Sequence, residues 1–94
     1  MTQRNVPGAM DGHWRARRVS GLLPPGVTKR ITAPVGQTLV FGCLFGTFDV
    51  VGDRFVYRFW PIVDVVAVAD GDTFVGRGLF LGLPFCRFRL ERVV

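Results

Sequence analysis

Residues that build metal and disulfide sites are scarce in this sequence. The 94 residues include only two cysteines, Cys43 and Cys86, and one histidine, His13. Two cysteines are too few for a disulfide framework, and their spacing does not match a zinc ligand set. We therefore expect reduced, buried thiols, no metal site and no cofactor.

Long apolar runs are missing as well. The longest candidate, residues 61–69, is interrupted by Asp64 and is shorter than the roughly 18–20 apolar residues that a membrane span requires. The first 12 residues contain no apolar block like that of a secretory signal. We expect a soluble, cytoplasmic protein that has no membrane partner.

Helical periodicity is also absent, and alternation of apolar and polar residues takes its place. Apolar spacings of three and four are not sustained, and Gly, Pro and β-branched residues recur throughout. Closure of the sheet is favoured, because a small open apolar sheet would expose edges prone to pairing. The sequence therefore predicts an all-β fold with little or no helix, a small antiparallel β-barrel of about eight short strands. Residues 11–94 would form this single domain after a flexible tail at residues 1–10, with strands at 12–19, 26–32, 37–43, 46–51, 54–60, 62–69, 73–80 and 85–92.

Apolar and basic residues are abundant. Hydrophobic residues make up 49% of the chain, with nine Phe and two Trp, which indicates a large buried fraction rather than disorder. The formal net charge is +5, and all but one of the 12 basic residues are Arg. Apart from Arg15, Arg17 and Arg18 they are dispersed, so nucleic-acid binding is kept only as an alternative.

Turn signals set the register of the last five strands. The turn at Gly52-Asp53 places Phe48 opposite Tyr57, and the turn at Asp70-Gly71 places Asp64 opposite Arg77. The turn at Leu81–Pro84 places Arg77 opposite Phe88, and the turn at Trp60-Pro61 places Tyr57 opposite Asp64. The inner face so predicted comprises Phe48, Val50, Phe55, Tyr57, Phe59, Ile62, Asp64, Val66, Val75, Arg77, Leu79, Cys86, Phe88 and Leu90.

The opposite face is charged except at a few positions. Val63, Val65 and Phe74 are apolar residues on this predicted outer face. Exposed apolar side chains of this kind indicate a subunit interface, so we expect a homodimer.

Asp64, Arg77 and Tyr57 together on an apolar face are the sharpest feature, because a few convergent polar groups in an apolar interior are typical of a small-molecule site. In one interpretation Asp64 and Arg77 form a buried ion pair that fixes the register, and the Tyr57 hydroxyl reaches Asp64. In the other, Arg77 anchors a ligand oxygen, Tyr57 donates to a carbonyl, and Asp64 orients the guanidinium or exchanges a proton. The apolar residues predicted to surround a ligand are Phe48, Phe55, Phe59, Val66, Leu79, Cys86 and Phe88.

Two further patterns concern the ends of the barrel. Trp14 in the first strand can stack beneath Arg92 of the last strand and form a barrel floor. The apolar loops Ser20–Gly26 and Leu81–Pro84 would suit the rim of a mouth for a greasy ligand, or else be buried by packing.

Gly12-His13-Trp14 and the terminal FRLER, which ends at Arg92, resemble the lipocalin and calycin barrels. They also resemble bacterial families with a GxWxG opening, nitrobindin-like proteins among them. The second half, from WPIVD to FRLER, looks like the C-terminal domain often paired with such segments. The resemblance covers residues 11–93 and departs from the motif at Ala16, which stands in place of the second glycine. No residue matches a nitrobindin-type haem histidine, so haem is not expected.

These patterns together predict a barrel that binds a hydrophobic small molecule, polyketide-like or terpenoid-like. The resemblance leaves the chemistry open, since small bacterial barrels of this shape include cofactor-free cyclases and isomerases. In such an enzyme Arg77 and Tyr57 would polarise a carbonyl, and Asp64 would relay a proton. The alternatives are a non-catalytic carrier or sensor and a basic barrel that binds nucleic acid.

Overall fold

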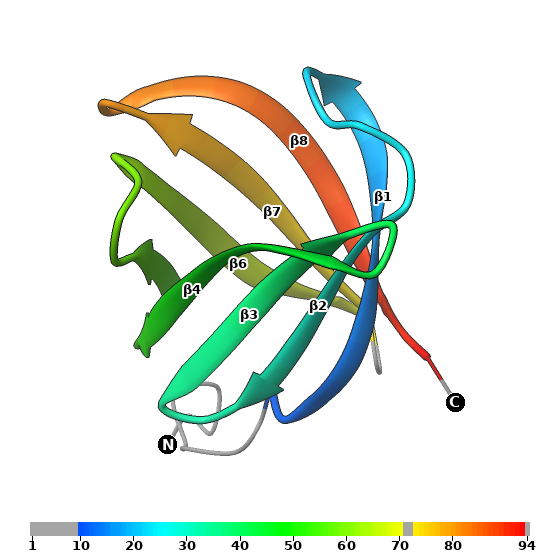
Figure 1. Ribbon diagram of the computed structural model, residues 1–94. Helices are drawn as coiled ribbons and strands as arrows, with labels where there is room; N and C mark the ends of the chain where they lie inside the picture. The colour runs from blue at the N-terminus through cyan, green and yellow to red at the C-terminus, as the bar shows by residue number, and fades with distance from the viewer. Residues whose placement is uncertain (1–9, 71–72, 94) are drawn as a thin grey trace, which may run out of the picture.

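The chain folds into one closed antiparallel barrel of eight strands (Figure 1), which confirms the predicted fold class. The computed structural model describes residues 10–70 and 73–93. Each strand pairs with the next along the chain, and the last strand returns to pair with the first. The strands are β1 (Gly12–Gly21), β2 (Val27–Thr32), β3 (Val35–Val40), β4 (Cys43–Val51), β5 (Arg54–Tyr57), β6 (Ile62–Asp70), β7 (Thr73–Phe80) and β8 (Leu83–Arg92).

The connections between strands alternate between the two ends of the barrel. One end, which we call the mouth, is uppermost in Figure 1 and carries the connections at residues 22–26, 41–42, 58–61 and 81–82. The other end, the floor, carries the connections at residues 33–34 and 52–53 together with the start of β1 and the end of β8. The described part of the chain contains no helix that could cross a membrane.

The floor is closed by a tryptophan and an arginine from the first and last strands. Trp14 is fully buried, and the guanidinium carbon of Arg92 lies 4.3 Å from the centroid of its ring. Trp14 Nε1 donates a hydrogen bond of 2.8 Å to the Met10 carbonyl. Residues 1–9 of the predicted tail lie outside the described residues, whereas Met10 is buried in the core.

The predicted register of β4 and β5 is correct. Phe48 lies opposite Tyr57 and Val50 opposite Phe55, as expected of a two-residue loop at Gly52-Asp53. Across β5 and β6 the register differs by two residues from the prediction, because Asp64 lies opposite Phe55. A shift of two residues keeps a side chain on the same face, so Asp64 and Tyr57 both point into the barrel.

The predicted pairing of Asp64 with Arg77 is wrong. Asp64 lies opposite Gly78, and Arg77 lies opposite Val65. The register of β6 and β7 shifts between Val68 and Asp70, next to the connection from which the pairing was counted. A slip of one residue turns every side chain of a strand to the other face, so Arg77 is exposed on the outside of the barrel.

The predicted pairing of β7 with β8 is wrong by one residue as well. The connecting turn holds two residues, Leu81 and Gly82, and not the four that were counted. Both have positive φ, 52° and 82°, which is the geometry of a type I′ hairpin turn. A register shift between Gly78 and Leu79 takes back one of the two residues, so Phe88 lies opposite Gly76.

Several side chains lie on a different face of the barrel from the predicted one. Phe74 points inward, where its ring packs edge-on against Trp14 at 5.2 Å between centroids, so the predicted outer apolar patch loses this residue. Val75 is exposed on the outer face, and Leu79 is half-buried opposite Val63 on that face. Phe59, predicted inside, is 87% exposed at the mouth.

Glycines occupy the centre of β7 on the inner face. A Cβ at Gly76 would lie 2.6 Å from Phe88 Cζ, and one at Gly78 would lie 2.8 Å from Cys86 Sγ. Both distances are too short for real contacts, so the missing side chains make room for the phenyl ring and the thiol of β8. These inward positions of β7 therefore require glycine, and the apolar pattern of the sequence does not mark them as inward.

Candidate functional site

A cavity of about 140 Å³ lies in the mouth half of the barrel. This volume is well above the roughly 10–15 Å³ that one water molecule needs. The wall is largely apolar and includes Leu23, Val27, Val40, Ile62 and Phe88. Four side chains form a polar group on one side of it, and we call them the polar quartet: Lys29, Thr38, Tyr57 and Asp64.

The quartet comes from four strands. Lys29 occupies an inward position of β2, between Val27 and Ile31, and Thr38 lies directly opposite it on β3. Tyr57 ends β5, and Asp64 is the third residue of β6. Each side chain points inward because of the two-residue alternation of its strand.

The quartet is one connected hydrogen-bond network. Lys29 Nζ donates to Thr38 Oγ1 and to the Tyr57 hydroxyl, both at 2.8 Å, and lies 3.1 Å from Asp64 Oδ2. The Tyr57 hydroxyl lies 2.5 Å from Thr38 Oγ1 and donates to Asp64 Oδ2 at 3.3 Å. No buried side-chain nitrogen or oxygen in the described part of the chain lacks a hydrogen-bond partner. A fully satisfied network of this kind is what makes a buried charge pair tolerable.

Aromatic rings surround the ammonium group of Lys29. Its Nζ lies between 5.3 and 5.9 Å from the ring centroids of Phe48, Phe55, Tyr57 and Phe88. At these distances a cation is attracted by the electron-rich faces of the rings. Both side chains of the Lys29–Asp64 pair are almost completely buried, with exposed fractions of 4% and 5%.

The environment stabilises the charged form of Lys29 and the neutral form of Tyr57. Burial alone would lower the pKa of Lys29, but attraction by Asp64 and by Tyr57 outweighs it and raises the pKa above its usual value. Burial raises the pKa of Tyr57, against the opposing effect of Lys29. At neutral pH Lys29 is therefore a cation and not an amine nucleophile, and Tyr57 is a neutral phenol.

Only part of the predicted site comes together. Asp64 and Tyr57 lie side by side in the cavity wall, whereas Arg77 is outside and Lys29 takes its place beside Asp64. Among the residues predicted to surround a ligand, Cys86 and Phe88 line the cavity.

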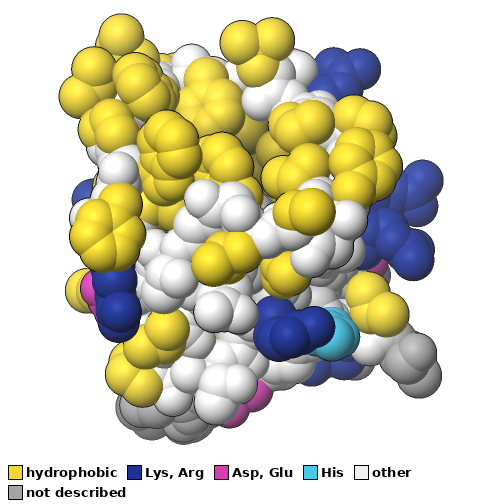
Figure 2. All heavy atoms as spheres, in the orientation of Figure 1, with side chains coloured by type: hydrophobic (Ala, Val, Ile, Leu, Met, Phe, Trp, Pro, Cys, Tyr) yellow, Lys and Arg dark blue, Asp and Glu magenta, His cyan; other side chains and the backbone are white. Residues whose placement is uncertain are grey.

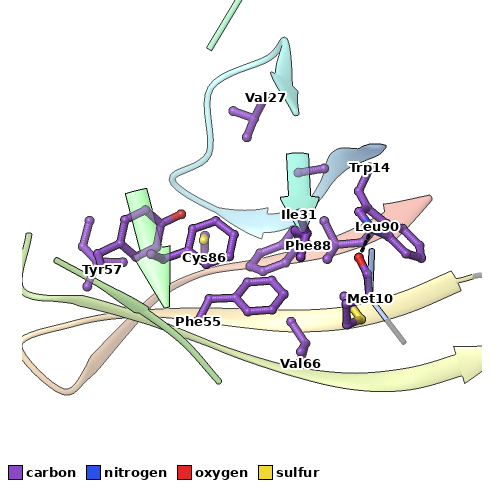
Figure 3. Close-up of a cluster of buried hydrophobic side chains, with 13 residues drawn as sticks. Met10, Trp14, Val27, Ile31, Phe55, Tyr57, Val66, Cys86, Phe88 and Leu90 are labelled. Carbon is purple, nitrogen blue, oxygen red and sulfur yellow. Dashed lines mark hydrogen bonds between the residues drawn. The ribbon is translucent and has the colours of Figure 1, made fainter. Parts of the chain in front are cut away.

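The other predicted ligand-binding residues lie elsewhere. Phe48, Phe55 and Val66 are buried but do not line the cavity, and belong to the packed core. Figure 3 shows this core running from Tyr57 and Cys86 past Phe55 and Phe88 to Trp14 and Met10. Phe59 and Leu79 lie outside the barrel. The described residues of the floor half are packed into this core, and the cavity lies toward the mouth.

The two cysteines differ in their surroundings. Cys86 is buried, and burial raises the pKa of its thiol, so it stays protonated. Cys43 is exposed, and the prediction that both thiols are buried is wrong for it. His13 lies on the outside of the floor, where it accepts a hydrogen bond from Arg30 Nε at 2.6 Å.

Lys29 and Thr38 were not predicted as site residues. A usable signal exists, since Lys29 is the only lysine of the chain and alternates with Val27 and Ile31. No turn signal fixed the register of β2 and β3 relative to the later strands, however. The inward face of these strands could therefore not be assigned from the sequence.

Comparisons of the chain with protein-family models, with curated proteins and with solved structures found no match. The resemblance to nitrobindin-like and other GxWxG proteins stays a prediction, and the site is interpreted from its own geometry.

Proposed function

We propose that this barrel binds a small hydrophobic molecule, polyketide-like or terpenoid-like, that carries a neutral oxygen group. The observation that supports it is the apolar cavity with the polar quartet in its wall. The apolar wall favours a hydrocarbon body, and the few polar groups give the ligand an orientation. The ligand enters from the mouth, toward which the cavity lies.

The charges of the quartet favour a neutral ligand. Lys29 and Asp64 neutralise each other at 3.1 Å, so a buried anion or cation of the ligand would find no unbalanced counter-charge. Both contacts of Asp64 within the quartet use Oδ2, which leaves Oδ1 to accept a hydrogen bond from a ligand hydroxyl. A ligand carbonyl would instead accept a hydrogen bond from the Thr38 or Tyr57 hydroxyl in place of the present acceptor within the quartet.

A matched series of ligands tests this proposal. We expect a terpenoid alcohol such as geraniol and the corresponding aldehyde to bind about tenfold or more tightly than the corresponding carboxylate. Titration calorimetry with the purified protein measures the three dissociation constants, and native mass spectrometry identifies any ligand that co-purifies. Equal affinity for alcohol and carboxylate would contradict the role of the quartet, and no binding of any of the three would contradict the proposal.

A double variant serves as the control for the quartet. Lys29→Met/Asp64→Leu replaces the ion pair by apolar groups and should bind the hydrocarbon limonene as the unmodified protein does. Its affinity for the alcohol should fall by about tenfold, because a hydrogen bond to a charged group is lost.

A second candidate is a cofactor-free isomerase or cyclase. It is favoured by the convergence of one carboxylate, Asp64, with two hydrogen-bond donors, Lys29 and Tyr57. For a substrate with an acidic proton next to a carbonyl, Asp64 would accept that proton while the donors stabilise the oxyanion. In D₂O the protein should then catalyse deuterium incorporation into an unsaturated ketone. Asp64→Asn, once shown to be folded, should abolish it, and an absence of incorporation would leave a non-catalytic carrier or sensor.

A further inference from the structure

The mouth carries six large apolar side chains that are mostly exposed to solvent. Their exposed fractions lie between 60% and 87%, and every connection at the mouth contributes at least one of them. Figure 2 shows apolar side chains gathered over the upper end of the barrel, in the orientation of Figure 1. We call these residues the mouth rim: Leu22, Phe41, Leu44, Phe59, Leu81 and Leu83. An exposed apolar surface of this kind marks a contact with another molecule.

The backbone at two turns indicates that the apolar side chains themselves are needed. Phe41 and Leu81 stand at the tips of mouth turns with φ of 51° and 52°, each followed by a glycine with positive φ. Such turns favour asparagine or aspartate at this position, because a bulky side chain is strained in the left-handed region. Both side chains are more than two-thirds exposed, so packing offsets little of the strain, although the Phe41 ring lies against Gly26.

Basic residues flank the mouth rim on the outer wall. Arg77 and Arg87 lie opposite each other on β7 and β8, only four residues from Leu81 and Leu83 respectively. On the neighbouring strand, Arg18 is hydrogen-bonded to the Gly21 carbonyl at the mouth end of β1. Like charges on facing positions repel each other, and a nearby anion relieves that repulsion.

The described carboxylates lie away from the mouth rim. Asp11, Asp53 and Glu91 lie at the floor end of the strands, and Asp64 is buried. Asp49 is paired with Arg58 at 2.8 Å. The mouth is therefore apolar at its tip and positive around it.

We propose that the mouth rim inserts into the surface of an anionic phospholipid bilayer, with Arg77 and Arg87 at the headgroup phosphates. A bilayer surface presents the complement of this pattern, an apolar interior beneath a negatively charged layer. The sequence alone predicted no membrane partner because no segment can span a bilayer, but surface docking depends on side chains that only the fold brings together. This docking to the bilayer does not depend on the proposed binding of a ligand in the cavity. If it does, docking lets an apolar ligand pass between bilayer and barrel without crossing water.

A second copy of the chain is a poorer occupant of this surface. Two mouths meeting face to face would bring both sets of arginines together, and nothing at the described part of the mouth offers carboxylates to balance them. Electrostatic complementarity therefore favours lipid over self-association.

Vesicle flotation with the full chain tests the proposal. The protein should float with vesicles of phosphatidylcholine containing about a third phosphatidylserine, and about tenfold less with phosphatidylcholine alone. Phe41→Asn/Leu81→Asn should reduce flotation by about tenfold or more, because two apolar side chains no longer insert. Asparagine suits both turns, so this variant should fold well and keep its ligand binding in solution. Equal flotation of the variant and the unmodified protein would overturn the proposal.

Matched variants assign the effect to the mouth. Val51→Asn changes an exposed apolar residue at the floor and should leave flotation unchanged. Arg77→Gln/Arg87→Gln should weaken binding to the anionic vesicles by about tenfold, whereas Arg54→Gln at the floor end of β5 should not.

Two outcomes would assign these surfaces to other partners and overturn the proposal. One is that the protein floats with neither vesicle but sediments as a dimer that Phe41→Asn/Leu81→Asn dissociates. The other is that Arg77→Gln/Arg87→Gln abolishes binding to RNA while flotation is unchanged.

Discussion

Replacement of Lys29 with methionine is expected to lower the free energy of unfolding by about 3–5 kcal/mol. The substitution leaves the Asp64 side chain, which is 5% exposed, without the cation that lies 3.1 Å from it. It also removes a donor to the Thr38 and Tyr57 hydroxyls. Because small domains are stable by only about 5–15 kcal/mol, the loss is a large part of the total. Chemical denaturation followed by tryptophan fluorescence measures it.

Two control variants separate a buried unpaired charge from the loss of a long side chain. Lys29→Met/Asp64→Leu removes both charges and should be within about 1–2 kcal/mol of the unmodified protein, or more stable. Arg58→Met breaks the exposed ion pair with Asp49, which is 2.8 Å long, and should cost less than about 1 kcal/mol. A Lys29→Met variant that loses no more than Arg58→Met would contradict the buried ion pair as a source of stability.

The same pair makes stability sensitive to alkaline pH. The pKa of Lys29 is raised in the folded state, so its contribution is complete below the ordinary value of 10.5 and is lost as pH rises through the folded pKa. The pKa of Tyr57 is raised from 10.0 and acts in the same direction. The free energy of unfolding should therefore fall from about pH 10 upward, and more steeply than in the Lys29→Met/Asp64→Leu variant.

Truncation of Trp14 to alanine is expected to cost about 3–5 kcal/mol and to open the floor of the barrel. The indole is fully buried, donates to the Met10 carbonyl at 2.8 Å and packs against Phe74 and Arg92. A cavity at this position cannot be filled by collapse, since the ends of β1 and β8 are held by the closed sheet. Thermal or chemical unfolding detects the loss.

The second tryptophan supplies a control of the same residue type. Trp60 is 45% exposed at the mouth, where its ring stacks on Phe45 at 5.1 Å. Trp60→Ala should cost no more than about 1 kcal/mol. Similar losses for the two tryptophans would show that the floor is not the better packed end.

The sequence predicted the fold class and the elements with local turn signals. Gly52-Asp53 forces a two-residue hairpin, and the pairing of Phe48 with Tyr57 follows directly. The stacking of Arg92 on Trp14 could also be predicted, because each residue follows the inward alternation of its own strand. These features depend on short-range rules that a single sequence contains.

The face of β7 could not be predicted, because its register is changed by irregularities on both sides. The register of β6 with β7 shifts next to Asp70. The two-residue turn at Leu81-Gly82, together with a shift between Gly78 and Leu79, displaces the pairing of β7 with β8 by one residue. The true inner face contains Gly76 and Gly78, which make no apolar pattern, while Val75 and Leu79 imitate one on the outer face. The face of β7 that points inward is set by the space that Phe88 and Cys86 of β8 need, and not by apolar side chains of β7 itself.

Only two residues of the polar quartet were predicted, for a similar reason. Asp64 and Tyr57 were placed inward by hairpin rules, but their cation comes from β2, more than 25 residues earlier in the chain. Only closure of the barrel brings Lys29 to them. A contact of that kind is set by the packing of the whole sheet and has no local signal.

The burial of the only lysine has a practical consequence. Reagents that acylate side-chain amines find none on the surface of the folded barrel, because the single ε-amino group is enclosed by four aromatic rings. Its modification requires the reagent to enter the cavity and the ammonium to lose its proton. Acylation of this one residue therefore reports access to the cavity, with no background from other lysines.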